Sequence, residues 1–373
     1  MTRNSFDTSD TTAGQFSLVK SRDELTSGRL DEDTAARVIK VLQDSTNLSG
    51  DGRVLQKLQA LMDQVRCQPP GAKRTAQMNT IVRTLGQPSN LATLLELLRD
   101  SLHAPDAKEA EISQRSRRGR MHCIYGWAGQ TLLLASHPEP TVGTSSPTDD
   151  MDSFLGYPPA EWDLSIHIWQ PNVGAKGFTS TKKIEPDTIV EPPHSHPFDF
   201  VSFVSMGEMH QSIYAESGVN DLTRELPPAD HQKRYDGVVL QRVDGVWPPH
   251  QEYRPARLDT LEERVLLQAG HSYFMPCDAI HDVEVNRAVA ERQPAITLFM
   301  CAEAIVKPHA FMAPEMADYH RRHPELKEEA QALTMEQWQS KLSAVIAYLR
   351  RQSQTLKLGE VVQCGTTYSF MHV

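Results

Sequence analysis

Apolar residues recur at helical spacing through the first third of the chain, from residue 31 to about residue 103. They form stripes in which apolar positions lie three or four residues apart, the period of one face of an amphipathic helix. Glycine and proline separate the stripes, because glycine accepts the left-handed turn at a helix end and proline cannot continue a helix interior. The breaks lie at Gly50, Pro69, Pro70, Gly71, Gly86 and Pro88. The pattern predicts four short helices, the last near residues 91 to 98.

The pattern changes at residue 161, where short apolar or alternating runs begin. Examples are "DLSIHIWQP", "DFVSFVSM" and "AITLFMCAEAIV", and proline, glycine, aspartate and histidine separate them. A period of two is typical of strands, and closely spaced short strands predict a small antiparallel barrel or sandwich. The preceding stretch "MHCIYGWAGQTLLLAS" is ambiguous between strand and helix.

Helical spacing returns near the C-terminus. Thr334 and Gln337 are spaced as a capping box, which marks the start of a helix. The segment that follows places four apolar residues on one face: Trp338, Leu342, Val345 and Leu349. The last apolar stretch, "EVVQCGTTYSFMHV", is expected to return as an edge strand.

The sequence therefore predicts a mainly β fold with flanking α-helices. Residues 1–28 are polar and aperiodic, which predicts a disordered tail. Residues 29–120 are expected to form a helical segment that ends in a basic linker, "RSRRGR". Residues 121–312 are expected to form a β-barrel with a polar insert at about 216–262, which we interpret as a lid. Residues 313–373 are assigned to C-terminal helices and the final strand.

Composition narrows the class of protein. The chain has five cysteines without a CxxC pair, which argues against a disulfide framework and against a thiolate zinc site. A net charge of -10 disfavours nucleic acid as a partner. The chain has no apolar run of about 18 residues and no targeting pattern at its start, so we expect no membrane contact and a cytoplasmic location.

Two histidines, His194 and His196, stand one residue apart in "EPPHSHPFDFVSFVSMGEMH". Side chains at i and i+2 of a strand point to the same face, so both imidazoles can aim at one point, as metal ligands must. Further along, "AGHSYFMPCDAIHDVEVN" contains a glycine turn, a strand, a proline turn and then His281. A strand pair of this kind can bring His281 back beside the first two histidines.

These two stretches resemble the paired motifs of the cupin superfamily, whose barrel is a jelly-roll-like double-stranded β-helix. The residues that match are His194, His196 and Gly207 in the first motif, and Gly270, Pro276 and His281 in the second. The sequence departs from the family pattern at three positions. Phe200 stands where the first motif has glutamate, Asp278 replaces the second glycine of the second motif, and Asn286 lies one residue late.

Without the glutamate, the resemblance is to three-histidine, mononuclear non-haem iron cupins such as the thiol dioxygenases. It implies Fe(II) on His194, His196 and His281, with O2 and a small chelating metabolite as the substrates. Zinc, nickel or manganese would bind the same ligands. No HxD motif of 2-oxoglutarate oxygenases occurs, and no cysteine follows the first motif to form the Cys-Tyr crosslink of some thiol dioxygenases.

Other residues are candidates for further roles around such a site. Tyr273, Tyr214 and Arg264 are candidates for orienting a substrate. His167 shares a face with Ser165 and Trp169 on its predicted strand, and the pattern leaves open whether that face lines the pocket.

A fourth metal ligand is a separate open question. Asp199, Glu208 and His210 are the nearest side chains that qualify by chemistry, although Asp199 is expected to face away from the even-numbered ligands.

Two alternative functions remain open at this point. A metal-dependent lyase or isomerase would use the same three histidines to hold a Lewis acid. A non-catalytic cupin sensor or scaffold would use the N-terminal helices for interactions. A homodimer is possible in either case.

Overall fold

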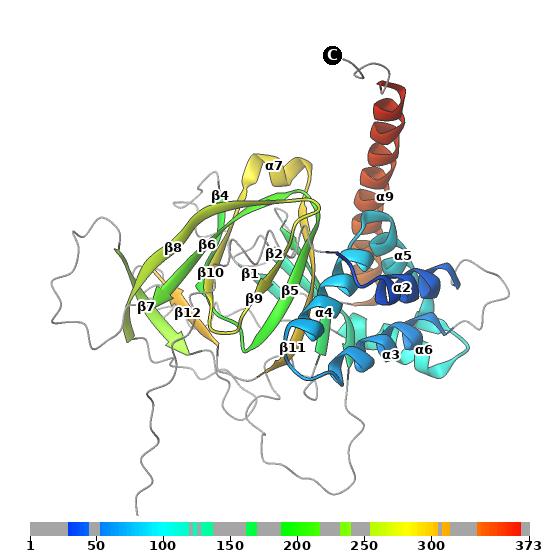
Figure 1. Ribbon diagram of the computed structural model, residues 1–373, viewed down its shortest axis with the longest axis horizontal. Coiled ribbons are helices and arrows are strands. Elements are labelled where there is room, and N and C mark those ends of the chain that lie inside the picture. The colour runs from blue at the N-terminus through cyan, green and yellow to red at the C-terminus, as the bar shows by residue number, and fades with distance from the viewer. Residues whose placement is uncertain are drawn as a thin grey trace, which may run out of the picture.

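The computed structural model describes residues 29–44, 53–118, 122–124, 128–136, 162–169, 188–216, 232–239, 254–304, 308–313 and 334–366. The predicted disordered tail lies outside these residues. The described chain is mainly β, with two antiparallel sheets and helices beside them (Figure 1). This confirms the predicted fold class.

The helices of the N-terminal segment pack against one another. They are α2 (Glu32–Asp44), α3 (Val54–Arg66), α4 (Ala72–Leu85), α5 (Pro88–Asp100), the short 3-10 turn η1 (Ser101–His103) and α6 (Ala107–Arg118). The first four are the helices that the apolar stripes predict. Local chemistry fixes their starts: the Asp31 carboxylate accepts a hydrogen bond from the Thr34 N–H at 2.9 Å, and Pro88 takes the first position of α5.

Helix α6 replaces most of the expected basic linker. Residues 115–118 are helical, and 119–120 lie outside the described residues. The apolar pattern did not reveal this helix, because its buried face carries small polar groups such as Ser113 and Ser116. Ser113 donates a hydrogen bond to the Leu98 carbonyl, and Arg115 donates one to Gln59 at 3.3 Å.

Six strands form the first sheet: β1 (His122–Ile124), β2 (Ala128–Ser136), β3 (Trp162–Trp169), β5 (Phe198–Met206), β9 (Ser272–Met275) and β11 (Ala295–Ala304), in the order β1-β2-β3-β11-β5-β9. The stretch that was ambiguous in sequence therefore contributes strands β1 and β2. The second sheet closes into a ring of β4 (Thr188–His194), β6 (Glu208–Glu216), β7 (Gln232–Val239), β8 (Arg254–Gln268), β10 (Ile280–Asn286) and β12 (His309–Met312), in the order β10-β4-β12-β7-β8-β6.

The order of strands within the sheets is that of a jelly roll. Leaving β7 aside, the strands from β3 to β11 give β3-β11-β5-β9 in one sheet and β4-β10-β6-β8 in the other. The chain crosses between the sheets at nearly every step, and the first and last of these strands lie side by side. This topology brings β4 and β10, which are distant in sequence, into hydrogen-bonded contact.

The expected polar insert is only partly an insert. Residues 232–239 and 254–262 belong to the ring strands β7 and β8, whereas 217–231 and 240–253 lie outside the described residues. Alternating residues such as Ala256 and Leu258 are buried inside the ring, so this part of the insert is structural and not a lid.

Both motif glycines adopt conformations that favour glycine. Gly207, between β5 and β6, has a φ of 76°, and a Cβ there would lie 2.8 Å from the Pro294 oxygen and the Ala295 Cα. Gly270, between β8 and β9, has a φ of 96° with nothing within 4 Å of a Cβ. The two turns that the motifs predict are therefore present.

Alternation along the strands divides the first sheet between two cores. One face, with Ile166 and Leu298, packs in a single cluster with α4 and with α9 (Met335–Thr366). The opposite face, with Trp169, Phe200 and Phe299, packs against the second sheet. The helices therefore share a core with the barrel instead of forming a separate unit.

The C-terminal helix confirms one prediction and corrects another. The capping box is present: the Gln337 N–H donates to the Thr334 Oγ1 at 3.2 Å, and the Thr334 N–H donates to the Gln337 Oε1 at 3.0 Å. The predicted final strand is wrong for residues 360–366, which continue α9. No proline interrupts the segment, and a short apolar run alone does not distinguish strand from helix. Residues 367–373 lie outside the described residues.

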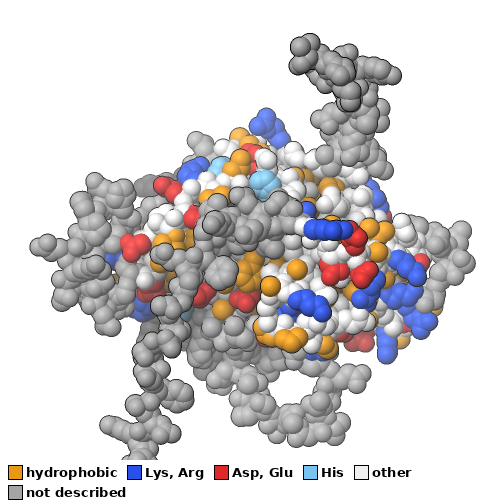
Figure 2. Space-filling model, viewed as in Figure 1, with side chains coloured by type: hydrophobic (Ala, Val, Ile, Leu, Met, Phe, Trp, Pro, Cys, Tyr) orange, Lys and Arg blue, Asp and Glu red, His pale blue; other side chains and the backbone are white. Residues whose placement is uncertain are grey.

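Basic and acidic side chains are interspersed, with some hydrophobic ones, over the helical side of the face shown in Figure 2. Among the described residues, no helix has the length and apolar character that crossing a bilayer requires.

Candidate metal centre

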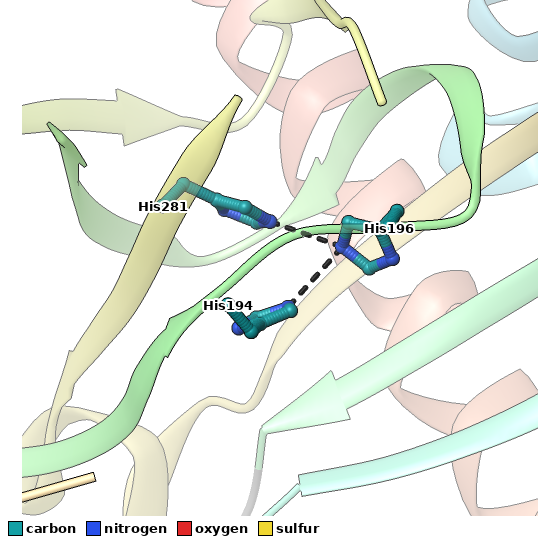
Figure 3. A group of neighbouring side chains, drawn as sticks. All are labelled: His194, His196 and His281. Atoms are coloured by element: carbon teal, nitrogen blue, oxygen red, sulfur yellow. Dashed lines mark hydrogen bonds between the residues drawn. The ribbon is translucent and has the colours of Figure 1, made fainter. Parts of the chain in front are cut away.

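Three histidines converge on one point between the sheets. His194 ends β4, His196 lies in the short link to β5, and His281 stands opposite His194 on the neighbouring strand β10. The Nε2 atom of His196 lies 3.2 Å from that of His194 and 3.0 Å from that of His281 (Figure 3). The structure therefore brings together the three residues that the sequence predicted as metal ligands.

The spacing of these nitrogens fits a shared metal ion. A metal held by imidazole lies about 2.0–2.1 Å from each nitrogen, so two ligand nitrogens at right angles are about 3 Å apart. All three ligand atoms lie within 4.8 Å of one another. Imidazole suits iron, zinc, nickel and copper alike, so the geometry supports a metal site without selecting the metal.

Hydrogen bonds to the other ring nitrogens bear on the ligand form of two histidines. The Nδ1 of His194 lies 2.9 Å from the Pro192 carbonyl oxygen, to which it can only donate, and this leaves a lone pair on Nε2. The Nδ1 of His281 lies 2.7 Å from the amide nitrogen, Nε2, of the buried Gln211 on β6, and in this orientation the amide donates to the ring. A half-turn of the amide places its oxygen there instead, and the oxygen then accepts the Nδ1 proton of His281 and frees Nε2 for a metal.

His196 lies in an apolar surrounding. The Phe198 ring stacks on it at 5.6 Å between centroids, and the Phe200 ring meets it edge-on at 4.8 Å. Burial, together with the charges of His194 and His167, holds the pKa of His196 well below its usual value. The ring is therefore neutral at pH 7, as a metal ligand must be.

A buried carboxylate that the sequence analysis did not single out lies beside the histidines. The Glu191 Oε1 is 3.7 Å from the His194 Nε2. Burial raises the pKa of Glu191, His194 opposes that rise, and Asp282 adds to it. Strict alternation would place Glu191 and His194 on opposite faces, so spacing along the chain gave no signal for it.

The predicted substrate-orienting residues fall in different places. Tyr273 lies on the inner face of the first sheet, with its ring 6.2 Å from that of Phe200. Tyr214 points into the separate core of the ring, where its hydroxyl donates to Asp282 at 2.6 Å. Arg264 is more than half exposed and pairs with Glu284 at 2.8 Å. Only Tyr273 is brought toward the histidines, because strand alternation turns Tyr214 away.

The candidates for a fourth ligand do not join the histidines. Among the described residues, the cluster able to hold a metal consists of the three histidines, without Asp199, Glu208 or His210. The Asp199 carboxylate instead accepts the Cys277 N–H at 2.9 Å, so it ties β5 to the turn before β10.

Polar side chains on the first sheet face the same interior. His167 on β3 stacks on Phe299 at 4.4 Å and meets Trp169 edge-on at 5.0 Å. The Trp169 Nε1 and the Thr297 Oγ1 are buried and have no hydrogen-bond partner among the described residues. Thr297 stands opposite His167 in the sheet. These groups are available to bond with a small molecule.

No protein-family model matches the chain, and no curated protein matches it by sequence. Solved structures that match in part include a hydroquinone 1,2-dioxygenase from Sphingomonas sp. TTNP3 with 4-hydroxybenzoate bound, at 14% identity and a TM-score of 0.19, covering 39% of this chain and 62% of that one. An oxalate decarboxylase mutant from Bacillus subtilis matches at 10% identity and a TM-score of 0.22, covering 51% of this chain and 29% of that one.

KdgF from Halomonas sp. matches at 9% identity and a TM-score of 0.21, covering 49% of this chain and 86% of that one. The chain thus spans less than two thirds of the dioxygenase and of the decarboxylase. Likeness at these TM-scores carries no inference about activity.

Proposed function

We propose that this chain is a metal-dependent cupin oxygenase, an iron(II) dioxygenase that acts with O2 on a small chelating metabolite. The observation that carries the proposal is the convergence of the Nε2 atoms of His194, His196 and His281, with His196 3.0–3.2 Å from the other two, between two antiparallel sheets. Three neutral imidazoles leave coordination positions and positive charge for an anionic substrate. Iron(II) held there supplies a route for electrons from the substrate to dioxygen.

The residues around the histidines have separate tasks in this proposal. The Pro192 carbonyl accepts the Nδ1 proton of His194 and holds that ring in the ligand orientation. The Gln211 amide, turned so that its oxygen instead of its nitrogen faces His281, would do the same for His281. Phe198 and Phe200 cover His196 with apolar surface, which limits the access of water.

The substrate side of the proposal rests on the first sheet. The Trp169 Nε1–H and the Thr297 hydroxyl can donate hydrogen bonds to an oxygen of the substrate, and Tyr273 is a further candidate for orienting it. The aromatic rings of Phe299 and Phe200 favour a flat or apolar body for the rest of the substrate.

Metal content and oxygen uptake test the proposal together. Protein purified without a polyhistidine tag is analysed for metal, reconstituted with iron(II), and treated with nitric oxide for electron paramagnetic resonance. The expected result is near-stoichiometric iron with a nitrosyl signal, followed by oxygen uptake in a substrate screen. His281→Ala is expected to lose both tight metal binding and turnover, and a full metal complement in that variant would remove His281 from the site.

Other outcomes point to the alternative functions. Turnover under strict anaerobiosis without oxygen uptake would refute the oxygenase and indicate a metal-dependent lyase or isomerase on the same site. Failure to retain or bind any metal would refute the enzyme reading and favour a sensor or scaffold.

A further inference from the structure

We propose that Glu191 is the fourth protein ligand of the metal and replaces in space the glutamate that is lost at Phe200. The inference rests on the proposed metal site. It gives a residue of β4, before His194, the role of metal ligand that the cupin motif gives to a glutamate after the second histidine. Its starting point is the distance of 3.7 Å between the Glu191 Oε1 and the His194 Nε2.

Strand register explains how Glu191 reaches the histidines. In the β4–β10 pair, Glu191 stands opposite Val283 and His194 stands opposite His281. Along β4, two residues lie between Glu191 and His194, whereas along β10 only one residue lies between His281 and Val283. The register therefore shifts between these two pairs, which is the signature of a bulge. Val283 belongs to the inner core, so Glu191 lies on the inner face, where His281 also points.

Measured from His194, the remaining movement is small. A carboxylate oxygen that shares a metal with His194 at right angles would lie about 3 Å from its Nε2. The observed 3.7 Å exceeds this by less than about 1 Å, which a rotation of the flexible glutamate side chain covers.

Charge supplies an independent reason. A buried carboxylate is costly unless it is paired or binds a metal, and the Glu191 side chain is only 13% exposed. A divalent ion on three neutral histidines carries two uncompensated positive charges. Ligation by Glu191 lowers that net charge to one and pairs the carboxylate in the same step.

The neighbouring carboxylates are committed elsewhere. Asp282 accepts hydrogen bonds from the Tyr214 hydroxyl at 2.6 Å and from the Ser212 N–H at 2.8 Å. Asp199 accepts one from the Cys277 N–H. Glu191 is outside the cluster of three histidines too, but its Oε1 lies 3.7 Å from the His194 Nε2, so it is the better candidate.

A fourth protein ligand narrows the substrate class. Of six positions around an octahedral metal, four would be filled by protein and two would remain for substrate and dioxygen. Two positions are too few for dioxygen and a two-atom chelate together. The substrate would then bind through a single oxygen, nitrogen or sulfur atom, or the chelating metabolite proposed above would have to displace Glu191.

Cobalt(II) titration of the full-length protein tests the assignment, since the visible absorption of cobalt reports both affinity and coordination. Glu191→Gln keeps the size of the side chain but makes it a poor ligand, and Glu284→Gln removes a carboxylate from the opposite face of the adjacent strand. We expect Glu191→Gln to weaken cobalt binding at least tenfold and to change the spectrum, with Glu284→Gln within twofold of the wild type in both.

Each other outcome has a distinct meaning. Unchanged affinity in Glu191→Gln, or weaker binding with an unchanged spectrum, would overturn ligation by Glu191 while the three-histidine site stands. Failure of the wild-type protein itself to bind cobalt would overturn the proposed metal function and this inference with it. Circular dichroism of each variant confirms that it is folded.

Discussion

Replacing Gln211 by leucine tests whether the amide beside His281 prepares that ring for a metal. Gln211 is fully buried, its amide nitrogen lies 2.7 Å from the His281 Nδ1, and a half-turn of the amide puts its oxygen in the same place. A metal on Nε2 fixes the proton of neutral His281 on Nδ1, so the metal-bound state needs an acceptor at this place. Leucine has similar volume and offers none.

The expected loss of metal affinity follows from the hydrogen bonds that His281 loses in the metal-bound and in the metal-free protein. In the metal-bound state the Nδ1–H becomes a buried donor without a partner, which costs about 1–3 kcal/mol. The metal-free state avoids this cost by moving the proton to Nε2, which can donate to the His196 Nε2 at 3.0 Å. The penalty therefore falls on metal affinity, and we expect Gln211→Leu to weaken binding by about 10- to 100-fold.

The assay is a competition between the protein and a chelator of known affinity, with the exposed Gln293→Leu as the matched control. Urea unfolding of both metal-free variants measures any loss of stability separately. Metal affinity in Gln211→Leu within twofold of the wild type would refute the argument, because the bond to His281 would then contribute nothing to the ligand form.

Two further predictions address the fold around the site. In Gly207→Ala, left-handed backbone strain of about 1–2 kcal/mol adds to a steric clash with the β11 backbone of about 1–3 kcal/mol. Gly270→Ala carries the strain alone, so we expect it to lose less free energy of unfolding. Equal losses for the two variants in urea unfolding would contradict this difference. Burial, with Asp199 beside it, raises the pKa of the Cys277 thiol to about 11, so only roughly one part in a thousand is thiolate at pH 8. Iodoacetamide should therefore modify Cys277 at least tenfold more slowly than the exposed Cys67, and equal labelling rates by mass spectrometry would refute the protected thiol.

The sequence predicted those helices and strands whose large apolar residues recur with a single, regular period. The stripes of α2 to α5 and the alternation of β5 and β11 carry large apolar residues at regular spacing, and the structure has these elements. Helix α6 escaped notice because serine covers much of its buried face. The sequence did not predict the continuation of α9, because a short apolar run such as Val361-Val362 fits a strand or a helix equally well.

The residues of the candidate site likewise divide into those that local sequence predicts and those that it does not. His194, His196 and His281 were predictable because their spacing and the flanking turns are local properties of two short stretches. Gln211 and Glu191 depend on which strand lies beside which and on a shifted register between β4 and β10. Local spacing in the sequence reveals neither the neighbouring strand nor the register, so these two residues could be identified only from the three-dimensional structure.

The helical layer bears on the site through the first sheet. The three histidines come from the second sheet and its link to β5, whereas the groups that face them, such as Thr297 and Phe299, stand on β11. The other face of β11 packs on the helices, and Arg74 of α4 grips Glu303 at the end of that strand with two hydrogen bonds of 2.9–3.0 Å. The helices thus support, from its other face, the sheet that faces the histidines. Because they also cover that face of the sheet, the predicted homodimer, if it forms through the barrel, must use a different surface.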